Sequence, residues 1–139
     1  MTAGLERFVE AQRSTYEDAL RELAAGTKRG HWMWWIFPQI AGLGRSPTAR
    51  HYAIRDAVEA PGYLAHPILG TRLIECTEAM LVWAGRRRAD AILGPIDALK
   101  FESSMTLFDA VADEAENAFA RALAAFYHGE RDPLTLERL

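Results

Sequence analysis

The apolar residues of this chain recur with the spacing of amphipathic helices. From Leu5 to Leu23 they fall every three or four positions, and Gly26 stands where a helix C-terminal cap belongs. A second stripe alternates spacings of four and three residues and comprises Leu69, Leu73, Cys76, Met80 and Trp83. These patterns predict two long helices, with Cys76 and Trp83 on one buried face. Gln12 interrupts the first stripe, so its amide must find a buried hydrogen-bond partner or face a cavity.

Prolines and glycines divide the rest of the chain into shorter helices. Ser46-Pro47 has the form of an N-cap followed by a first helical residue, which predicts a helix running to Arg55. Other helix starts have a comparable form: His66-Pro67, Gly94-Pro95 and Asp132-Pro133. The Ala-Pro-Gly sequence at residues 60–62 predicts a break, and a further helix is expected over about residues 114–128. No segment alternates with a period of two residues, so no sheet is expected.

Together these elements predict one all-α domain over residues 1–139, a compact orthogonal or irregular bundle of about six helices. A chain of 139 residues, half of them apolar and a quarter charged, can bury a sizeable core. Its single cysteine excludes an internal disulfide and suits a reducing compartment. The acidic N-terminal 25 residues do not form a secretory signal, and no apolar run approaches the length of a bilayer span. We therefore expect a cytoplasmic protein with no membrane partner.

Charge and histidine spacing narrow the range of partners. The net charge of −3 and a pI near 5.8 argue against nucleic acid as a partner. The dense basic run Arg86-Arg87-Arg88 follows Gly85 and is interpreted as a solvated turn. The four histidines lack the close spacing of metal ligands, so neither a metal nor a cofactor is expected. These features leave the oligomeric state open.

Three of the four tryptophans fall within the stretch from His31 to Gln39, which we expect to form one or two helical turns that end at Pro38. Neither helical nor extended backbone lets Trp32, Trp34 and Trp35 share one face. If all three are buried, the transfer of their surface from water contributes about 15 kcal/mol to folding, before the loss of conformational entropy is subtracted. The segment is therefore expected to form either the centre of the core or the wall of a pocket.

A glycine loop follows the tryptophans and leads into the helix predicted at Ser46. Gly42, Gly44, Arg45 and Ser46 could bind a phosphate or another anion, because a helix N-terminus offers free backbone N–H groups and Arg45 adds a positive charge. The loop is not the dinucleotide-binding fingerprint, since no strand precedes it and the third glycine is missing. An ordinary turn between helices is the alternative interpretation.

A second unusual stretch runs from Lys100 to Asp109. Ser103, Ser104 and Thr106 are poor helix formers inside an otherwise helical pattern. Small hydroxyl groups on an apolar face either permit close approach of another helix or line a polar pocket. Lys100 follows Asp97 by three residues, so the two could simply form an exposed ion pair.

The chain resembles a bacterial family of unknown function that often carries the label "calpastatin". The matching residues cover almost the whole chain: Phe8, Ala11-Gln12, Tyr16, Gly26, Lys28, His31-Trp32-Met33-Trp34, Ile36-Phe37-Pro38-Gln39, Gly42-Leu43-Gly44, Tyr52-Ala53-Ile54, Tyr63-Leu64, His66-Pro67, Leu69-Gly70, Arg72-Leu73, Lys100 and Ser103-Ser104-Met105-Thr106-Leu107-Phe108. The resemblance implies a small, mainly helical domain and brings no activity, cofactor or catalytic residue with it. The label itself is discounted, because calpain inhibitors of that name are disordered and highly charged, whereas this chain has the apolar content of a packed domain.

Two functional hypotheses follow. In the first, the domain binds a small anionic or nucleotide-like metabolite, and hydrolyses it or transfers part of it if it is an enzyme. Its pocket would bring together His31, Trp34, Trp35, Gln39, Lys100, Ser103 and Ser104, with His31 and Asp109 as the candidates for general acid–base chemistry. In the second, the aromatic segment of a non-catalytic interaction module docks a protein partner. A concave pocket of tryptophan and polar groups favours the first, and a flat exposed apolar patch favours the second.

Overall fold

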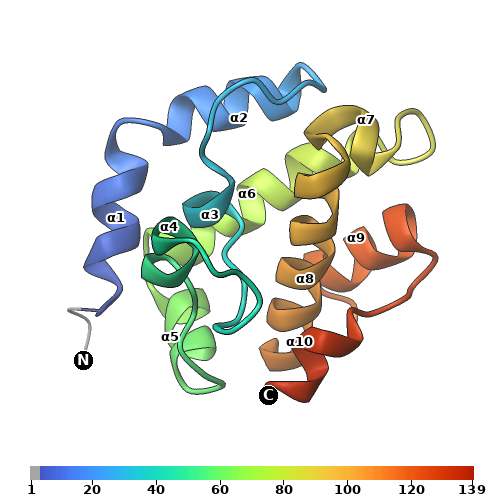
Figure 1. The fold of residues 1–139 in the computed structure, drawn as a ribbon. Coiled ribbons are helices and arrows are strands. Elements are labelled where there is room, and N and C mark those ends of the chain that lie inside the picture. Colours follow the sequence, from blue (N-terminus) through green and yellow to red (C-terminus); the bar gives the residue numbers. More distant parts are fainter. Residues whose placement is uncertain (1–3) are drawn as a thin grey trace.

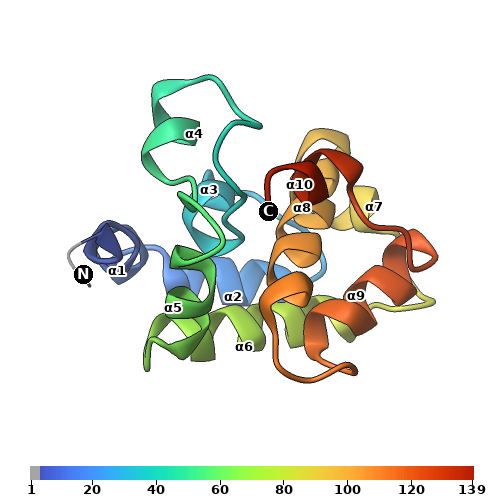
Figure 2. The same ribbon diagram turned by 90° about the horizontal axis from the view of Figure 1, so that it is seen from below.

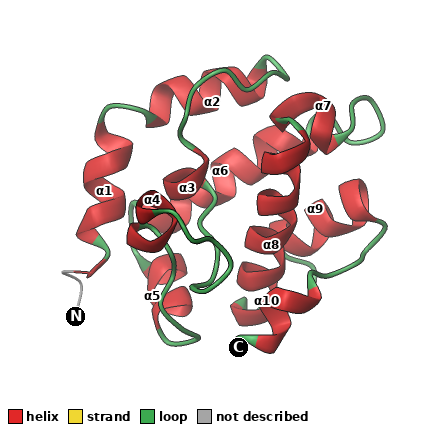
Figure 3. Ribbon diagram, viewed as in Figure 1, coloured by secondary structure: helices red, strands yellow, loops and turns green. Residues whose placement is uncertain are grey.

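The computed structural model describes residues 4–139, and within this range the chain folds into ten helices (Figures 1 and 3). They are α1 (Glu6–Arg13), α2 (Tyr16–Ala24), α3 (Met33–Ile36), α4 (Pro47–His51), α5 (Glu59–Ala65), α6 (Leu69–Leu81), α7 (Ala89–Leu93), α8 (Pro95–Val111), α9 (Ala118–Tyr127) and α10 (Pro133–Glu137). No strand is present among these residues, and one isolated parallel bridge joins Ile40 to Ile54. The all-α prediction is confirmed, but the helices number ten rather than about six.

Helices α6 and α8 form the centre of the bundle. Helix α8 packs against α5, α7, α9 and α10, while α6 packs against α2, α5 and α9. Seen from below in Figure 2, α3, α4 and the loop between them lie across from α8 and α10. One face of α8 therefore contributes to the core, and another faces the loop that follows the tryptophan segment.

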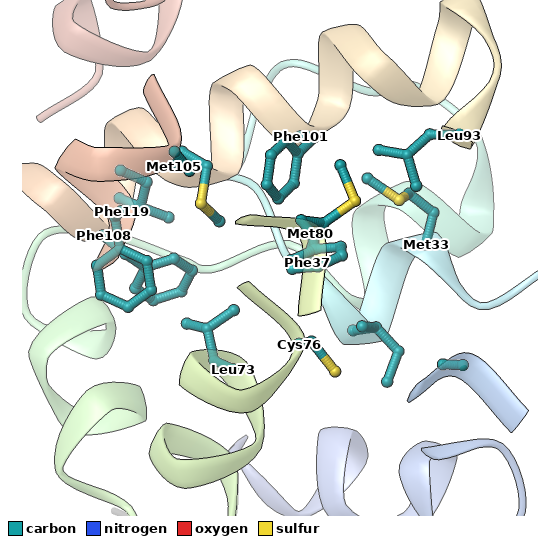
Figure 4. Close-up of a cluster of buried hydrophobic side chains, with 14 of the residues drawn as sticks. Met33, Phe37, Leu73, Cys76, Met80, Leu93, Phe101, Met105, Phe108 and Phe119 are labelled. Atoms are coloured by element: carbon teal, nitrogen blue, oxygen red, sulfur yellow. The ribbon is translucent and has the colours of Figure 1, made fainter. Parts of the chain in front are cut away.

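Aromatic rings and thioethers fill the space between α6, α8 and the tryptophan segment (Figure 4). The Phe101 ring on α8 is fully buried, and its centroid lies 4.8 Å from that of Phe37 and 6.2 Å from that of Phe126. Met80 and Met105 are equally buried in the same cluster. Flexible thioethers adapt to the irregular gaps that ring edges leave, which suits Met80 and Met105 to this aromatic cluster.

The first predicted helix is interrupted. Instead of one helix over residues 5–23, the chain forms α1 and α2 with Ser14 and Thr15 between them. The Thr15 hydroxyl donates to the carbonyl of Ala11 at 2.7 Å and accepts the indole N–H of Trp35 at 2.8 Å. The hydrophobic stripe did not indicate this break, because the spacing of apolar residues continues across it.

Two other predicted boundaries were also wrong. Helix α4 ends at His51 instead of Arg55, and α9 begins at Ala118, where the Asn117 side chain caps the N–H of Ala120, instead of near residue 114. Residues 60–62 lie inside α5 rather than breaking the chain. Pro61 is the third residue of that helix, where its missing N–H costs no intrahelical hydrogen bond.

Of the two residues predicted on the buried face of the second stripe, Cys76 is in the core and Trp83 is not. Cys76 is buried in α6, and this burial raises the pKa of its thiol to about 12, so it is an inert core residue. Trp83 lies beyond the end of α6 and is only half-buried. Its indole N–H donates to the carbonyl of Leu23 at 2.9 Å, and its ring covers Gly26, where an added Cβ would lie 2.8 Å from a ring carbon.

The buried partner expected for Gln12 is present. Its amide N–H groups donate to the carbonyl oxygen of Trp35 at 2.8 Å and to the hydroxyl of Tyr63 at 3.2 Å. Its amide oxygen accepts from Arg72 at 3.4 Å. This buried amide therefore ties α1 to the tryptophan segment, α5 and α6.

Candidate functional site

A cavity of about 640 Å³ lies between the loop that follows α3, one face of α8 and the start of α10. It is lined by seven of the eleven residues selected from the sequence: Trp34, Gln39, Gly44, Arg45, Ser46, Lys100 and Ser103. Its apolar wall is formed by Leu43, Ala49, Ile96, Leu99 and Leu134. Segments about 60 residues apart in sequence thus meet around one concavity that has the volume of a small-molecule pocket.

Lys100 and Trp34 contact each other at this cavity. The ammonium nitrogen of Lys100 lies 4.5 Å from the centroid of the Trp34 ring, which is the geometry of a cation–π pair. Both side chains are half-buried, because α8 and α3 hold them at the cavity wall. The contact joins the two stretches that the sequence singled out and combines a flat ring with a positive charge.

The two lysines of the chain converge on a single carboxylate. Lys28 lies 2.9 Å from Asp97 and donates to the carbonyl of Gly30 at 2.6 Å, while Lys100 lies 3.5 Å from the other Asp97 oxygen. The Lys28 and Asp97 side chains are 10% and 17% exposed, so they form the closer and more buried pair. Lys28 also lies near the carboxylate of Glu22, so Lys100 is the more distant and less buried partner of Asp97 in this group of charges.

The tryptophans that surround Trp34 have structural roles. Trp32 is 2% exposed, and its indole N–H donates to Glu22 at 2.9 Å. Trp35 donates to Thr15 from the other side of α3 and does not line the cavity. The three indoles point in different directions, as the backbone geometry predicts, and only Trp34 presents a face to the cavity.

Glu22 fixes the chain just before the tryptophans. One of its carboxylate oxygens accepts hydrogen bonds from the backbone N–H groups of Arg29 and Gly30, at 2.7 and 2.9 Å, and from Trp32. Burial alone would raise the pKa of this carboxyl, but these donors and the nearby charge of Lys28 lower it below its usual value.

We expect Glu22→Gln to lower the free energy of unfolding by about 1 kcal/mol at neutral pH, because an amide oxygen is a weaker acceptor for three donors. The folded-state pKa is depressed, so this stabilisation is present above the unfolded pKa and disappears as pH falls through the folded value. Urea unfolding at pH 7 and pH 3 measures it. The gap between wild type and variant should close at the lower pH, and a gap of constant size would contradict the assignment.

The opposite wall of the cavity is acidic. The carboxylate of Asp132 accepts from the hydroxyl of Ser103 at 3.0 Å, and from the backbone N–H and hydroxyl of Thr135 at 3.1 and 2.5 Å. Asp132 is thereby the N-cap of α10, and one of its two carboxylate oxygens accepts all three hydrogen bonds. Glu102 lines the same wall, and within residues 4–139 its carboxylate has neither a hydrogen-bond donor nor an ion-pair partner. Burial, with the negative charges of Asp132 and Glu130, raises the pKa of Glu102.

Four of the selected residues lie away from the cavity. Trp35 is hydrogen-bonded to Thr15, and the His31 side chain is exposed without lining the cavity. Ser104 is fully buried, and its hydroxyl has no hydrogen-bond partner among the described residues. Gly42 lies against the guanidinium of Arg138. Asp109, an acid–base candidate, also lies elsewhere, bound by Arg131 and Asn117.

The glycine loop offers fewer donors than its sequence suggests. The Ser46 hydroxyl already accepts from the N–H of Ala49 at 3.1 Å, so it caps α4 itself. Helix α4 has only five residues, which limits the dipole at its N-terminus. Arg45 is exposed and has no ion-pair partner within residues 4–139. The loop therefore contributes to the cavity chiefly through the charge of Arg45.

A second cavity, of about 720 Å³, is larger but less suited to a ligand. Its wall includes the basic turn at Arg86-Arg87-Arg88, which is exposed as expected. The guanidinium carbons of Arg86 and Arg87 lie 5.1 and 5.9 Å from the centroid of the Trp83 ring. Arg88 forms an ion pair with Asp90 at 2.9 Å. All three guanidinium groups thus have partners, and none of the residues that the sequence selected as ligand-binding lines this second cavity.

The described residues show neither a metal-ligand cluster nor a membrane span. Among residues 4–139, no three histidine, cysteine, aspartate or glutamate side chains gather closely enough to hold an ion. In the same part of the chain, no helix has the length and apolar character needed to cross a bilayer.

Comparisons with known proteins bear on the family and the fold. No curated protein matches the sequence. A solved structure, that of the conserved hypothetical protein Rv1873 from Mycobacterium tuberculosis, is 47% identical, with a TM-score of 0.92. The match covers 97% of this chain and 95% of that one. The model of a family described as "Protein of unknown function (DUF1810)" matches residues 2–139. The chain therefore belongs to the DUF1810 family.

Proposed function

We propose that the protein binds a small anionic, nucleotide-like metabolite in the cavity between Trp34 and Lys100. The observation that carries this proposal is the ammonium group of Lys100 on the face of Trp34, at the wall of a cavity of about 640 Å³. A ligand ring that stacks on Trp34 takes the place of the Lys100 ammonium on that ring, and the displaced ammonium pairs with the anionic group of the ligand. The volume falls within the range of ligand pockets in proteins, about 300–1,000 Å³.

The charge balance of the cluster supports an anionic group on the ligand. Lys28 is the closer and more buried partner of Asp97, so Lys100 is the more weakly paired of the two lysines. Lys100 is 24% exposed and can therefore approach a ligand without giving up its helix position. Arg45 adds a second positive charge from the loop.

The surroundings of Trp34 support a planar group. Base stacking on an aromatic side chain contributes about 1–3 kcal/mol and tolerates different rings. Trp34 is held by neighbours on both sides, with Trp32 hydrogen-bonded to Glu22 and Trp35 to Thr15. The backbone that carries Trp34 is therefore already ordered before a ligand stacks on its ring, which lowers the entropic cost of binding.

A docking role for the aromatic segment has weaker support. In that role the aromatic segment itself contacts the partner, but Trp32 is 2% exposed and the indole N–H of Trp35 is bound to Thr15. The available aromatic surface is the face of Trp34, which belongs to a concave site.

The test is calorimetric titration with guanosine and with guanosine 5′-monophosphate (GMP), preceded by native mass spectrometry for a co-purifying ligand. We expect Lys100→Met to weaken GMP binding at least tenfold, which corresponds to about 1.4 kcal/mol. Guanosine, which lacks the phosphate, should be affected much less.

The matched control is Arg121→Met. Arg121 is an exposed cation on α9 that pairs with Glu78 and does not line the cavity, so this variant should bind GMP like wild type. Equal losses in both variants would indicate a general charge effect and contradict the site. Absence of binding by GMP and by adenosine 5′-monophosphate (AMP) would contradict the proposed function itself.

A further inference from the structure

The cavity has an acidic side opposite its basic side, and this polarity restricts the ligand. Lys100 and Glu102 are separated by two positions on α8. At about 100° per residue they stand about 160° apart around the helix axis, with Leu99 and Ser103 between them. All four residues line the cavity. The diameter of a helix with its side chains, about 10–12 Å, sets the spacing of the two charged groups at roughly 10 Å.

Within the acidic wall, Glu102 is the carboxylate available to a ligand. One oxygen of Asp132 accepts from Ser103 and from two donors of Thr135, so this carboxylate is held in place as the N-cap of α10. The Glu102 carboxylate has no donor or cation of its own within residues 4–139, although it is partly desolvated. A desolvated carboxylate without donors is unfavourable, and a ligand that supplies N–H groups removes this cost.

We propose that the ligand's heterocycle carries two adjacent N–H donors on one edge, as guanine does, with Glu102 accepting both while Lys100 binds the anionic group at the other end. The inference rests on the proposed function, because it assumes that the ring stacks on Trp34. A carboxylate has two oxygens in one plane and accepts two parallel N–H groups in a bidentate contact. Guanine presents such a pair at N1 and N2, whereas hypoxanthine retains only the N1 donor.

The test compares GMP with inosine 5′-monophosphate (IMP), which has the same phosphate and sugar but lacks the 2-amino group. We expect wild-type protein to bind GMP at least tenfold more tightly than IMP, because a site built for a donor discriminates against a ligand that lacks it. In Glu102→Gln the preference should fall to threefold or less. An amide offers one acceptor and one donor group, so it matches the guanine edge poorly.

Glu130→Gln is the matched control. This variant replaces a carboxylate by an amide of the same shape, as Glu102→Gln does. Glu130 lies near Glu102 and contributes to its electrostatic environment, but it does not line the cavity. This variant should retain the GMP preference of wild type. Thermal unfolding of both variants checks that each remains folded, and a loss of preference in both would overturn the specific role of Glu102.

The outcomes separate the inference from the proposed function. If GMP and IMP bind equally well to wild type, and both lose affinity in Lys100→Met, the guanine-type edge is wrong but the anionic ligand stands. If GMP, IMP and AMP all fail to bind, both are overturned. Preference for GMP that depends on Glu102 and not on Glu130 supports the inference.

Discussion

Gly70→Ala should lower the free energy of unfolding by about 3 kcal/mol or more. Gly70 lies in the first turn of α6, fully buried against the end of α5. A Cβ at this position would overlap the carbonyl oxygen of Leu64 and lie 2.8 Å from its carbonyl carbon. Both atoms belong to the backbone, so no side-chain rotation relieves the overlap, and α5 must move away from α6.

Gly62→Ala provides the matched control in the same region. Gly62 lies within α5 but has no atom within 4 Å of an added Cβ. Alanine favours a helix over glycine by about 1 kcal/mol, so this variant should be as stable as wild type or more so. Urea unfolding of both variants measures the difference, and equal midpoints would contradict the close approach of α5 and α6.

Phe101→Ala should cost about 3–5 kcal/mol, the range found when a buried aromatic side chain is removed. The ring is fully buried between Phe37 and Phe126, and its centroid lies 6.3 Å from that of the Tyr127 ring. Its removal leaves a cavity between α8, α9 and the tryptophan segment that the three neighbouring rings cannot fill. The effect should appear as a lower urea midpoint.

Leu99→Ala, on the same helix, is the control for this prediction. Leu99 is 67% exposed, so its truncation should change the free energy of unfolding by no more than about 0.5 kcal/mol. Equal destabilisation of the two variants would contradict the assignment of the Phe101 effect to core packing.

The sequence predicted the fold class and most helix starts because these depend on local chemistry. Ser46 and Asp132 cap the helices predicted at Pro47 and Pro133, and Pro95 is the first residue of α8. The predicted number of helices was wrong because tertiary contacts, and not local sequence, determine where some helices are interrupted. The break at Thr15 depends on a hydrogen bond from Trp35, a residue 20 positions away, which no local pattern reveals.

The candidate site was predictable in part for a similar reason. Trp34 and Lys100 stood out because they are unusual side chains in apolar surroundings, and they meet at the cavity. Ser104 shared that sequence context but is buried away from it. Glu102 and Asp132 were missed, since carboxylates are common on exposed helix faces and their burial depends on how α10 packs against α8. The N-cap position of Asp132 was the available signal.

The anchoring of α3 has a consequence for the kinetics of binding. This short helix is held before its start by Glu22, at its centre by Thr15, and after its end by the bridge between Ile40 and Ile54. Its backbone does not have to be ordered by a ligand, so the free and bound forms should differ by about 1 Å or less. Association would then proceed in a single encounter step. Differences in affinity between related ligands would reside in how long each remains bound, rather than in how fast it arrives.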